Sequence, residues 1–190
     1  MTYNTFLAGS QIINERLQMQ LILDLTYQRG FLSMPFHRVY FTDQSLKTEL
    51  LPNSRFKIPI GIRANYFIGD RFILRSFYRF YHDDWGLTAN TAELETVVKL
   101  NPLLSVSPFY RFYHQNGIHY FAPYVEHLLT DQYYSSNYDL SSFTSHYIGT
   151  GLRWMLLKKL IGLKQIELRY GHYFRTNSLQ SDILSLQVKF

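Results

Sequence analysis

The C-terminal stretch Lys164–Phe190, KQIELRYGHYFRTNSLQSDILSLQVKF, decides how the rest of the chain is interpreted. It reads as two strands joined by a polar turn at residues 176–178. In the final strand, every second residue is apolar and the chain stops on an aromatic residue. An apolar face opposite a mostly polar one is the pattern of a strand in the wall of an outer-membrane β-barrel, with Phe190 facing the membrane. The apolar face carries Leu184, Leu186, Val188 and Phe190, and the other carries Ile183, Ser185, Gln187 and Lys189.

The same two-residue period recurs along most of the chain. A helix would place apolar residues at intervals of three and four, so the pattern favours β-strands. We therefore predict an all-β fold, an antiparallel up-and-down transmembrane β-barrel, with residues 1–190 forming a single barrel segment. The alternating segments are residues 17–27, 57–66, 71–83, 92–100, 105–113, 148–154 and 166–175, besides the C-terminal strand, and residues 2–13 alternate less regularly.

Composition agrees with this prediction and excludes several other classes of protein. The 190 residues include 16 Tyr and 15 Phe, residue types that form the interfacial girdles of membrane barrels. No run approaches the ~20 apolar residues of a membrane helix. The absence of cysteine excludes a disulfide scaffold, a thiolate zinc site and a cysteine nucleophile.

The basic charge balance does not indicate nucleic acid. The net charge is +5, but the 19 Lys and Arg residues are spread over many segments. A nucleic-acid-binding surface would gather them in one patch or on one helix face. We expect no nucleic-acid partner, no cofactor and no resident metal.

Two long stretches break the alternation and predict extracellular loops at about residues 29–55 and 115–142. The first contains Pro35 and Pro52 around an aromatic centre that we expect to pack. The second is either one ordered loop or a hairpin, because Asn116-Gly117 is a strong hairpin signal. Short turns are expected at residues 14–15, 69–70, 101–102 and 158–162.

The loop and hairpin alternatives give nine or eleven strands, both of which are odd numbers. Bacterial single-chain barrels have even strand numbers with both chain ends in the periplasm. If Phe190 lies at the periplasmic rim, the short turns fall inside and the long loops outside. The sequence therefore predicts the C-terminal part of a larger barrel. The N-terminus lacks the pattern of a signal peptide, so export requires that a signal was removed or lies further upstream.

Charged residues alternate with the apolar ones and predict a polar lumen. An arginine facing lipid near the bilayer midplane would cost ~2–4 kcal/mol. Because Arg75 and Arg79 can face Glu93 and Glu95 on the next strand, the pattern favours a self-neutralising network over an open anion channel. The predicted lumen residues are Arg63, Arg71, Arg75, Arg79, Glu93, Glu95, Lys99, Arg111, Glu167, Arg169 and Arg175.

A rim motif follows one of these strands. The sequence YRFYH at Tyr78–His82 recurs at Tyr110–His114, which predicts one position in the outer aromatic girdle used twice. The first copy runs into the rim motif His82, Asp83, Asp84 and Trp85. Its carboxylates suit a calcium ion, but two are too few for a site by themselves, so solvated loop acids are the preferred interpretation.

Three stretches carry a resemblance to a known family: residues 28–41 (QRGFLSMPFHRVYF), residues 78–86 (YRFYHDDWG) and residues 182–186 (DILSL). Together they resemble an uncharacterised family of outer-membrane β-barrel proteins of Gram-negative bacteria. The resemblance implies a barrel fold, a location in the outer membrane and a protein about twice this length. It brings no catalytic residues.

We expect a non-enzymatic outer-membrane protein, either a transport pore or a structural or assembly component. Its expected partners are outer-membrane lipid, the barrel-assembly machinery through the C-terminal strand, and other envelope proteins. One alternative is an enzyme acting on lipid or lipopolysaccharide at the rim, although no Gly-x-Ser-x-Gly occurs. Another is a soluble ligand-binding β-barrel, whose apolar faces would point inward.

Overall fold

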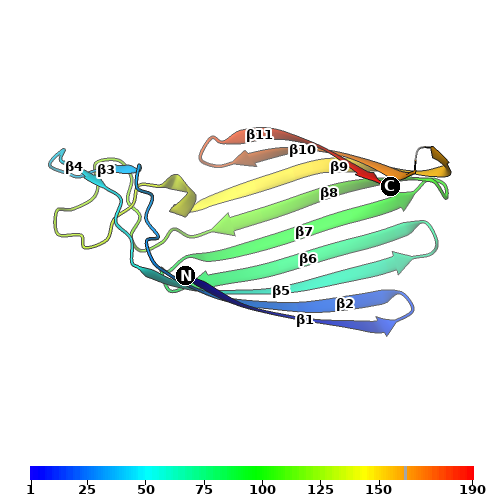
Figure 1. The fold of residues 1–190 in the computed structure, drawn as a ribbon, viewed down its shortest axis with the longest axis horizontal. Helices are drawn as coiled ribbons and strands as arrows, with labels where there is room; N and C mark the ends of the chain where they lie inside the picture. Colours follow the sequence, from blue (N-terminus) through cyan, green and yellow to red (C-terminus); the bar gives the residue numbers. More distant parts are fainter. Residues whose placement is uncertain (161) are drawn as a thin grey trace.

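The computed structural model describes residues 1–160 and 162–190, and they form an all-β structure (Figure 1). Nine antiparallel strands form one sheet in the order β1-β2-β5-β6-β7-β8-β9-β10-β11, and β3 and β4 pair separately. No helix in the described part of the chain is long and apolar enough to cross a membrane. The strands are β1 (Thr2–Asn14), β2 (Leu17–Arg29), β3 (Arg38–Tyr40), β4 (Leu46–Thr48), β5 (Ser54–Ile68), β6 (Phe72–Asp83), β7 (Thr88–Lys99), β8 (Leu104–Gln115), β9 (Phe143–Leu160), β10 (Leu163–Arg175) and β11 (Gln180–Lys189).

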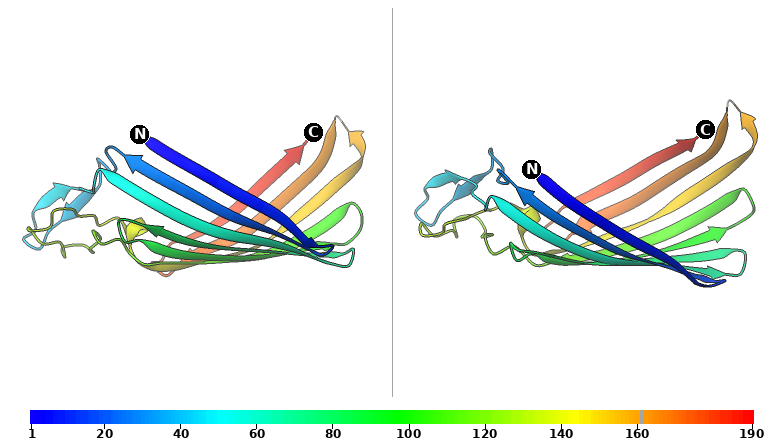
Figure 2. Two further views of the ribbon diagram at one scale, coloured as in Figure 1. Left: turned by 90° about the horizontal axis from the view of Figure 1, so that it is seen from below. Right: turned by 60° about the horizontal axis from the view of Figure 1, so that its bottom comes forward.

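The sheet is curved (Figure 2). Its two faces also differ in polarity. In β7, Leu94 is 47% exposed, whereas its neighbour Glu95 is only 7% exposed. Glu95 is covered because Arg169 of β10, three strands away, reaches it from the same face. The charged face is therefore the concave face, and the apolar side chains of the alternating pattern lie on the convex face.

The expected all-β, up-and-down antiparallel order is confirmed, but the sheet is not closed. The strands β1 and β11 are its two edges, each paired on one side only. Because they are the first and ninth strands of an antiparallel sheet, both run in the same direction. The N-terminus accordingly lies at the loop end of the sheet and the C-terminus at the opposite end, which we call the turn end (Figure 1).

The structure corrects three predicted connections. Residues 116–142 form one ordered loop with a short 3-10 helix, η1 (Tyr138–Leu140), so the hairpin alternative is wrong and the main sheet has nine strands. The predicted loop at 29–55 contains the β3–β4 hairpin. Of the turn predicted at 158–162, residues 158–160 belong to β9 instead, and residue 161 lies outside the described residues.

The two long loops pack on each other. Val39 and Phe41 from the first loop and Tyr134 from the second form a buried cluster. A backbone bridge joins Leu50 to Tyr134. Glu49 is 3% exposed and accepts a hydrogen bond from the Ser135 hydroxyl. The aromatic centre of the first loop therefore packs against the second loop.

Two paired glycines allow a close approach between β9 and β10. Gly149 and Gly171 are directly opposite each other. A Cβ at Gly149 would overlap the backbone oxygen of Tyr170, and a Cβ at Gly171 would overlap the ring of Tyr147. The rings of Phe109 and Tyr147, 5.0 Å apart, cover the glycines. Glycine in a strand commonly marks such a site of bending.

We predict that Gly149→Ala destabilises the protein by about 1–3 kcal/mol, as overpacking substitutions do. Thermal unfolding followed by circular dichroism should show a midpoint several degrees lower. The matched control is Gly9→Ala, because a Cβ at that strand position has open space around it. Equal midpoints for the two variants would contradict the role assigned to the glycine pair.

Candidate functional site

Arginines and carboxylates form a chain of ion pairs across the concave face. The Glu95 carboxylate of β7 forms ion pairs with the guanidinium groups of Arg75 of β6, at 3.0 Å, and Arg169 of β10, at 2.9 Å. Arg169 also lies 3.8 Å from Glu167, which pairs with Arg153 of β9 at 3.0 Å. Glu95 and Glu167 are both 7% exposed. This series of ion pairs therefore links β6, β7, β9 and β10. Each of its two buried carboxylates contacts two arginines.

Two further ion pairs lie closer to the loop end. Arg111 of β8 contacts Glu93 of β7 at 2.7 Å. Arg175, at the end of β10, contacts Asp139 of η1 at 2.6 Å and so ties the second long loop to the sheet.

Strand register decides which of the predicted pairs form. Arg75 and Glu95 are direct cross-strand partners and do pair. The predicted contact of Arg79 with Glu93 is absent, because Arg79 stands opposite Thr91. Glu93 instead has Arg111 as its register partner on the other side.

The remaining predicted lumen residues lie apart from this chain of ion pairs. Arg63 of β5 stacks over the ring of Phe77 at 5.4 Å. Arg71 and Lys99 lie at the turn end, where the Lys99 backbone N–H donates to the Arg71 carbonyl. The prediction omitted Arg153, although it alternates with glycines in β9 and faces the same side as Glu167.

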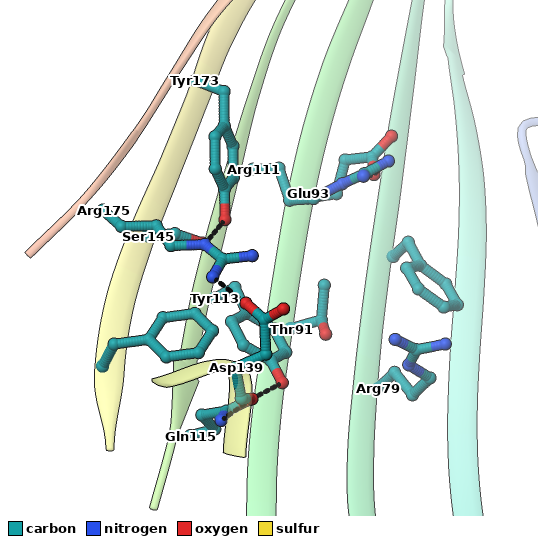
Figure 3. A pocket seen from close by; sticks show the side chains of 12 residues that line it. Arg79, Thr91, Glu93, Arg111, Tyr113, Gln115, Asp139, Ser145, Tyr173 and Arg175 are labelled. Carbon is teal, nitrogen blue, oxygen red and sulfur yellow. Dashed lines mark hydrogen bonds and ion pairs between the residues drawn. The ribbon is translucent and has the colours of Figure 1, made fainter. Parts of the chain in front are cut away.

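Three adjoining cavities of about 450, 470 and 420 Å³ follow the concave face. The first is bounded by Arg79, Arg111, Tyr113 and Arg175 and by Asp139 of the loop (Figure 3). The second lies around Arg63, Arg75 and the two glutamates of β7. The third extends from the first toward β2 and β5.

Water-accessible space and fixed charge therefore coincide on the concave face. Cationic side chains outnumber carboxylates there, since Glu95 and Glu167 are each shared between two arginines. A guanidinium has no acceptor and stays charged at all physiological pH values. This face can bind and orient polar, and especially anionic, solutes.

The rim motif divides into a buried half and an exposed half. Asp83 is 1% exposed and pairs with Arg55 of β5. Its carboxylate also accepts the backbone N–H groups of Trp85 and Leu87, at 3.0 and 3.1 Å. The indole N–H of Trp85 donates to the Ser54 carbonyl. This half is a clamp that fixes the β6–β7 turn against β5.

His82 and Asp84 are exposed. No group of three or more potential metal-ligating side chains occurs within the described residues. In the rim motif, the Asp83 carboxylate is therefore buried and has a structural role, whereas the Asp84 carboxylate is exposed.

We predict that Asp83→Asn destabilises the protein by about 3–5 kcal/mol, because it leaves the mostly buried Arg55 without its counter-charge. The midpoint of thermal unfolding should fall by about 10 °C. Asp84→Asn removes the same charge from the adjacent exposed position and should change the midpoint little. If both variants unfold at the same temperature, the clamp does not carry the stability assigned to it.

Comparison with known proteins identifies the family of this chain. No curated protein and no solved structure matches the chain. A family model described as protein of unknown function (DUF3570) matches residues 1–185, nearly the full length. The chain therefore belongs to the DUF3570 family.

Proposed function

We propose that the chain forms the wall of a non-enzymatic transmembrane β-barrel in the bacterial outer membrane. Its convex face contacts lipid, and its concave face lines an aqueous lumen through which polar solutes pass. The observation that carries the proposal is the reversed polarity of the curved sheet, which exposes large apolar residues such as Leu94 and buries the paired carboxylates of Glu95 and Glu167.

Large apolar side chains cover the convex face from one edge to the other. Cross-strand pairing places them on one face, as in the pairs Tyr110–Ile148 and Leu152–Leu168. Soluble monomers rarely expose apolar patches above a few hundred Å². Contact with lipid would cover this face. Its exposed members include Leu21, Ile60, Leu94, Ile148, Trp154, Leu168, Leu184 and Leu186.

Strand length and aromatic placement also support a membrane position. The nine strands of the main sheet have 10 to 18 residues, and a transmembrane β-strand needs ~9–11. Toward the loop end, the hydroxyl groups of tyrosines on the convex face make hydrogen bonds. The Tyr110 hydroxyl lies 2.7 Å from His146 Nδ1, and the Tyr170 hydroxyl donates to Asp182 Oδ1 at 2.8 Å. A ring with one apolar side and a hydrogen-bonded tip suits the membrane interface.

The directions of the edge strands restrict how such a barrel closes. Because β1 and β11 run the same way, an antiparallel closure needs an odd number of further strands between them. In lipid, the unpaired backbone groups of both edges must be satisfied. We propose that such strands complete the barrel, and that the assembly machinery engages the edge of β11 together with Phe190, which directly follows it.

We predict that Leu168→Arg impairs membrane insertion. Leu168 lies near the middle of β10 on the convex face, where an arginine in lipid costs ~2–4 kcal/mol. The fraction of protein inserted into phospholipid vesicles, measured by flotation, should fall strongly. In a water-soluble protein the same exposed position would accept arginine without loss.

The matched control is Gln187→Arg on β11, where the register partner is Glu167 of the concave face. This variant should insert like the parent protein. Equal insertion of Leu168→Arg, or recovery of the protein in solution without detergent, would contradict the proposed lipid contact.

The lumen proposal predicts an effect on ion selectivity. Glu95→Gln removes the carboxylate shared by Arg75 and Arg169 and leaves both cations unneutralised. Reversal potentials in planar bilayers should shift toward chloride over potassium. Glu15→Gln, at the exposed β1–β2 turn, removes one negative charge outside the lumen and should leave selectivity unchanged. A parent protein that conducts no ions would contradict the transport role.

A further inference from the structure

We propose that the concave face beside η1 holds a binding site for a sugar-sized anion, with Arg79 as the residue that recognises the acidic group. The inference deepens the proposed function and rests on it for its place, at the outer mouth of the lumen. The site itself is built from β2, from β5 to β10 and from the second long loop.

Arg79 stands where two cavities meet. It lines both the first cavity, of about 450 Å³, and the third, of about 420 Å³. Tyr113, Gln115 and Asp139 are shared by the same two cavities. One continuous space therefore runs past Arg79 and beneath η1.

The charge of Arg79 is not neutralised. The first cavity is lined by three arginines and two carboxylates, and both carboxylates already have partners: Glu93 pairs with Arg111, and Asp139 pairs with Arg175. Within the described part of the chain, Arg79 pairs with no carboxylate. Figure 3 shows it apart from the bonded group formed by Arg175, Asp139 and Gln115.

A second cation lines the adjoining part of the space. Lys57 of β5 bounds the third cavity and, within the described residues, takes part in no ion pair. Arg55 beside it is bound to Asp83. The carboxylate facing this cavity from β2 is Asp24, which accepts the side-chain amide of Asn4. The space thus keeps a positive balance.

The wall opposite Arg79 is held in place before any ligand arrives. Gln115 is 3% exposed, and its amide donates to the carbonyls of Asp139 and Ser141, at 2.9 and 2.6 Å. The Tyr113 hydroxyl donates to the Gln115 amide oxygen. A wall fixed in this way lowers the ordering cost of binding.

The lining indicates the chemical class of the ligand. A guanidinium fork matches a phosphate or a carboxylate. The rings of Phe77 and Tyr113 and the hydroxyls of Thr91 and Ser145 surround the same space, a combination suited to a sugar ring. Its volume lies within the range of small-molecule sites. The ligand is therefore a sugar that carries a phosphate or carboxylate group.

The test is calorimetric titration of the full chain in detergent with glucose 6-phosphate, glucose and inorganic phosphate. Glucose 6-phosphate should bind more tightly than the other two probes. Arg79→Gln should weaken its binding by about tenfold or more, since a charge-assisted hydrogen bond is lost. Arg79→Lys keeps the charge and should retain part of the affinity.

The matched control is Arg71→Gln, which removes the same charge from an exposed position at the turn end that lines none of the three cavities. It should change binding less than about twofold. Absence of binding by the parent protein, or equal binding by Arg79→Gln, would overturn the site. Inorganic phosphate binding as tightly as the sugar phosphate would overturn the sugar assignment. Vesicle insertion of the Arg79→Gln variant tests the membrane proposal separately.

Discussion

The close approach of β9 and β10 at Gly149 and Gly171 is the constraint on which the concave face depends. Without side chains at these two positions, the strands approach and the rings of Phe109 and Tyr147 lie over the backbone. Arg169 extends over Phe109 at 4.7 Å and reaches Glu95, three strands away. On a flat sheet such a span would exceed the reach of both side chains, since neighbouring strands lie ~4.8 Å apart. Curvature and charge pairing therefore support each other.

Curvature also separates the two faces by environment. On the concave side, bending crowds the side chains, so that Glu95 and Glu167 become buried with two arginines each. On the convex side, the same bending spreads Leu94, Leu168 and their neighbours apart and leaves them exposed. Burying a carboxylate is costly unless it is paired and hydrogen-bonded. The exposed apolar face fits the proposed contact with lipid.

Local alternation predicted most of the sheet, because a strand fixes the face of each residue by period two. It assigned Leu94 and Glu95 to opposite faces correctly. It could not choose the partner of Arg79, because register depends on the neighbouring turns and places Thr91 opposite Arg79. Nor could it find the contacts between the long loops: Glu49 meets Ser135 across 86 residues of sequence. The burial of Asp83 beside the exposed Asp84 likewise depends on Arg55, a residue of another strand.

The proposed anion site does not depend on how the sheet closes. Arg79 and the residues that fix its opposite wall come from β6, β8, β10 and η1, whereas the unpaired backbone groups belong to β1 and β11. Further strands between the edges would enclose the lumen from the far side and lower the local dielectric, which strengthens the field of an unneutralised arginine. The loop wall is likewise fixed from within, through Gln115, Arg175 and Asp139. Closure would therefore enhance the selectivity of the Arg79 site rather than create it.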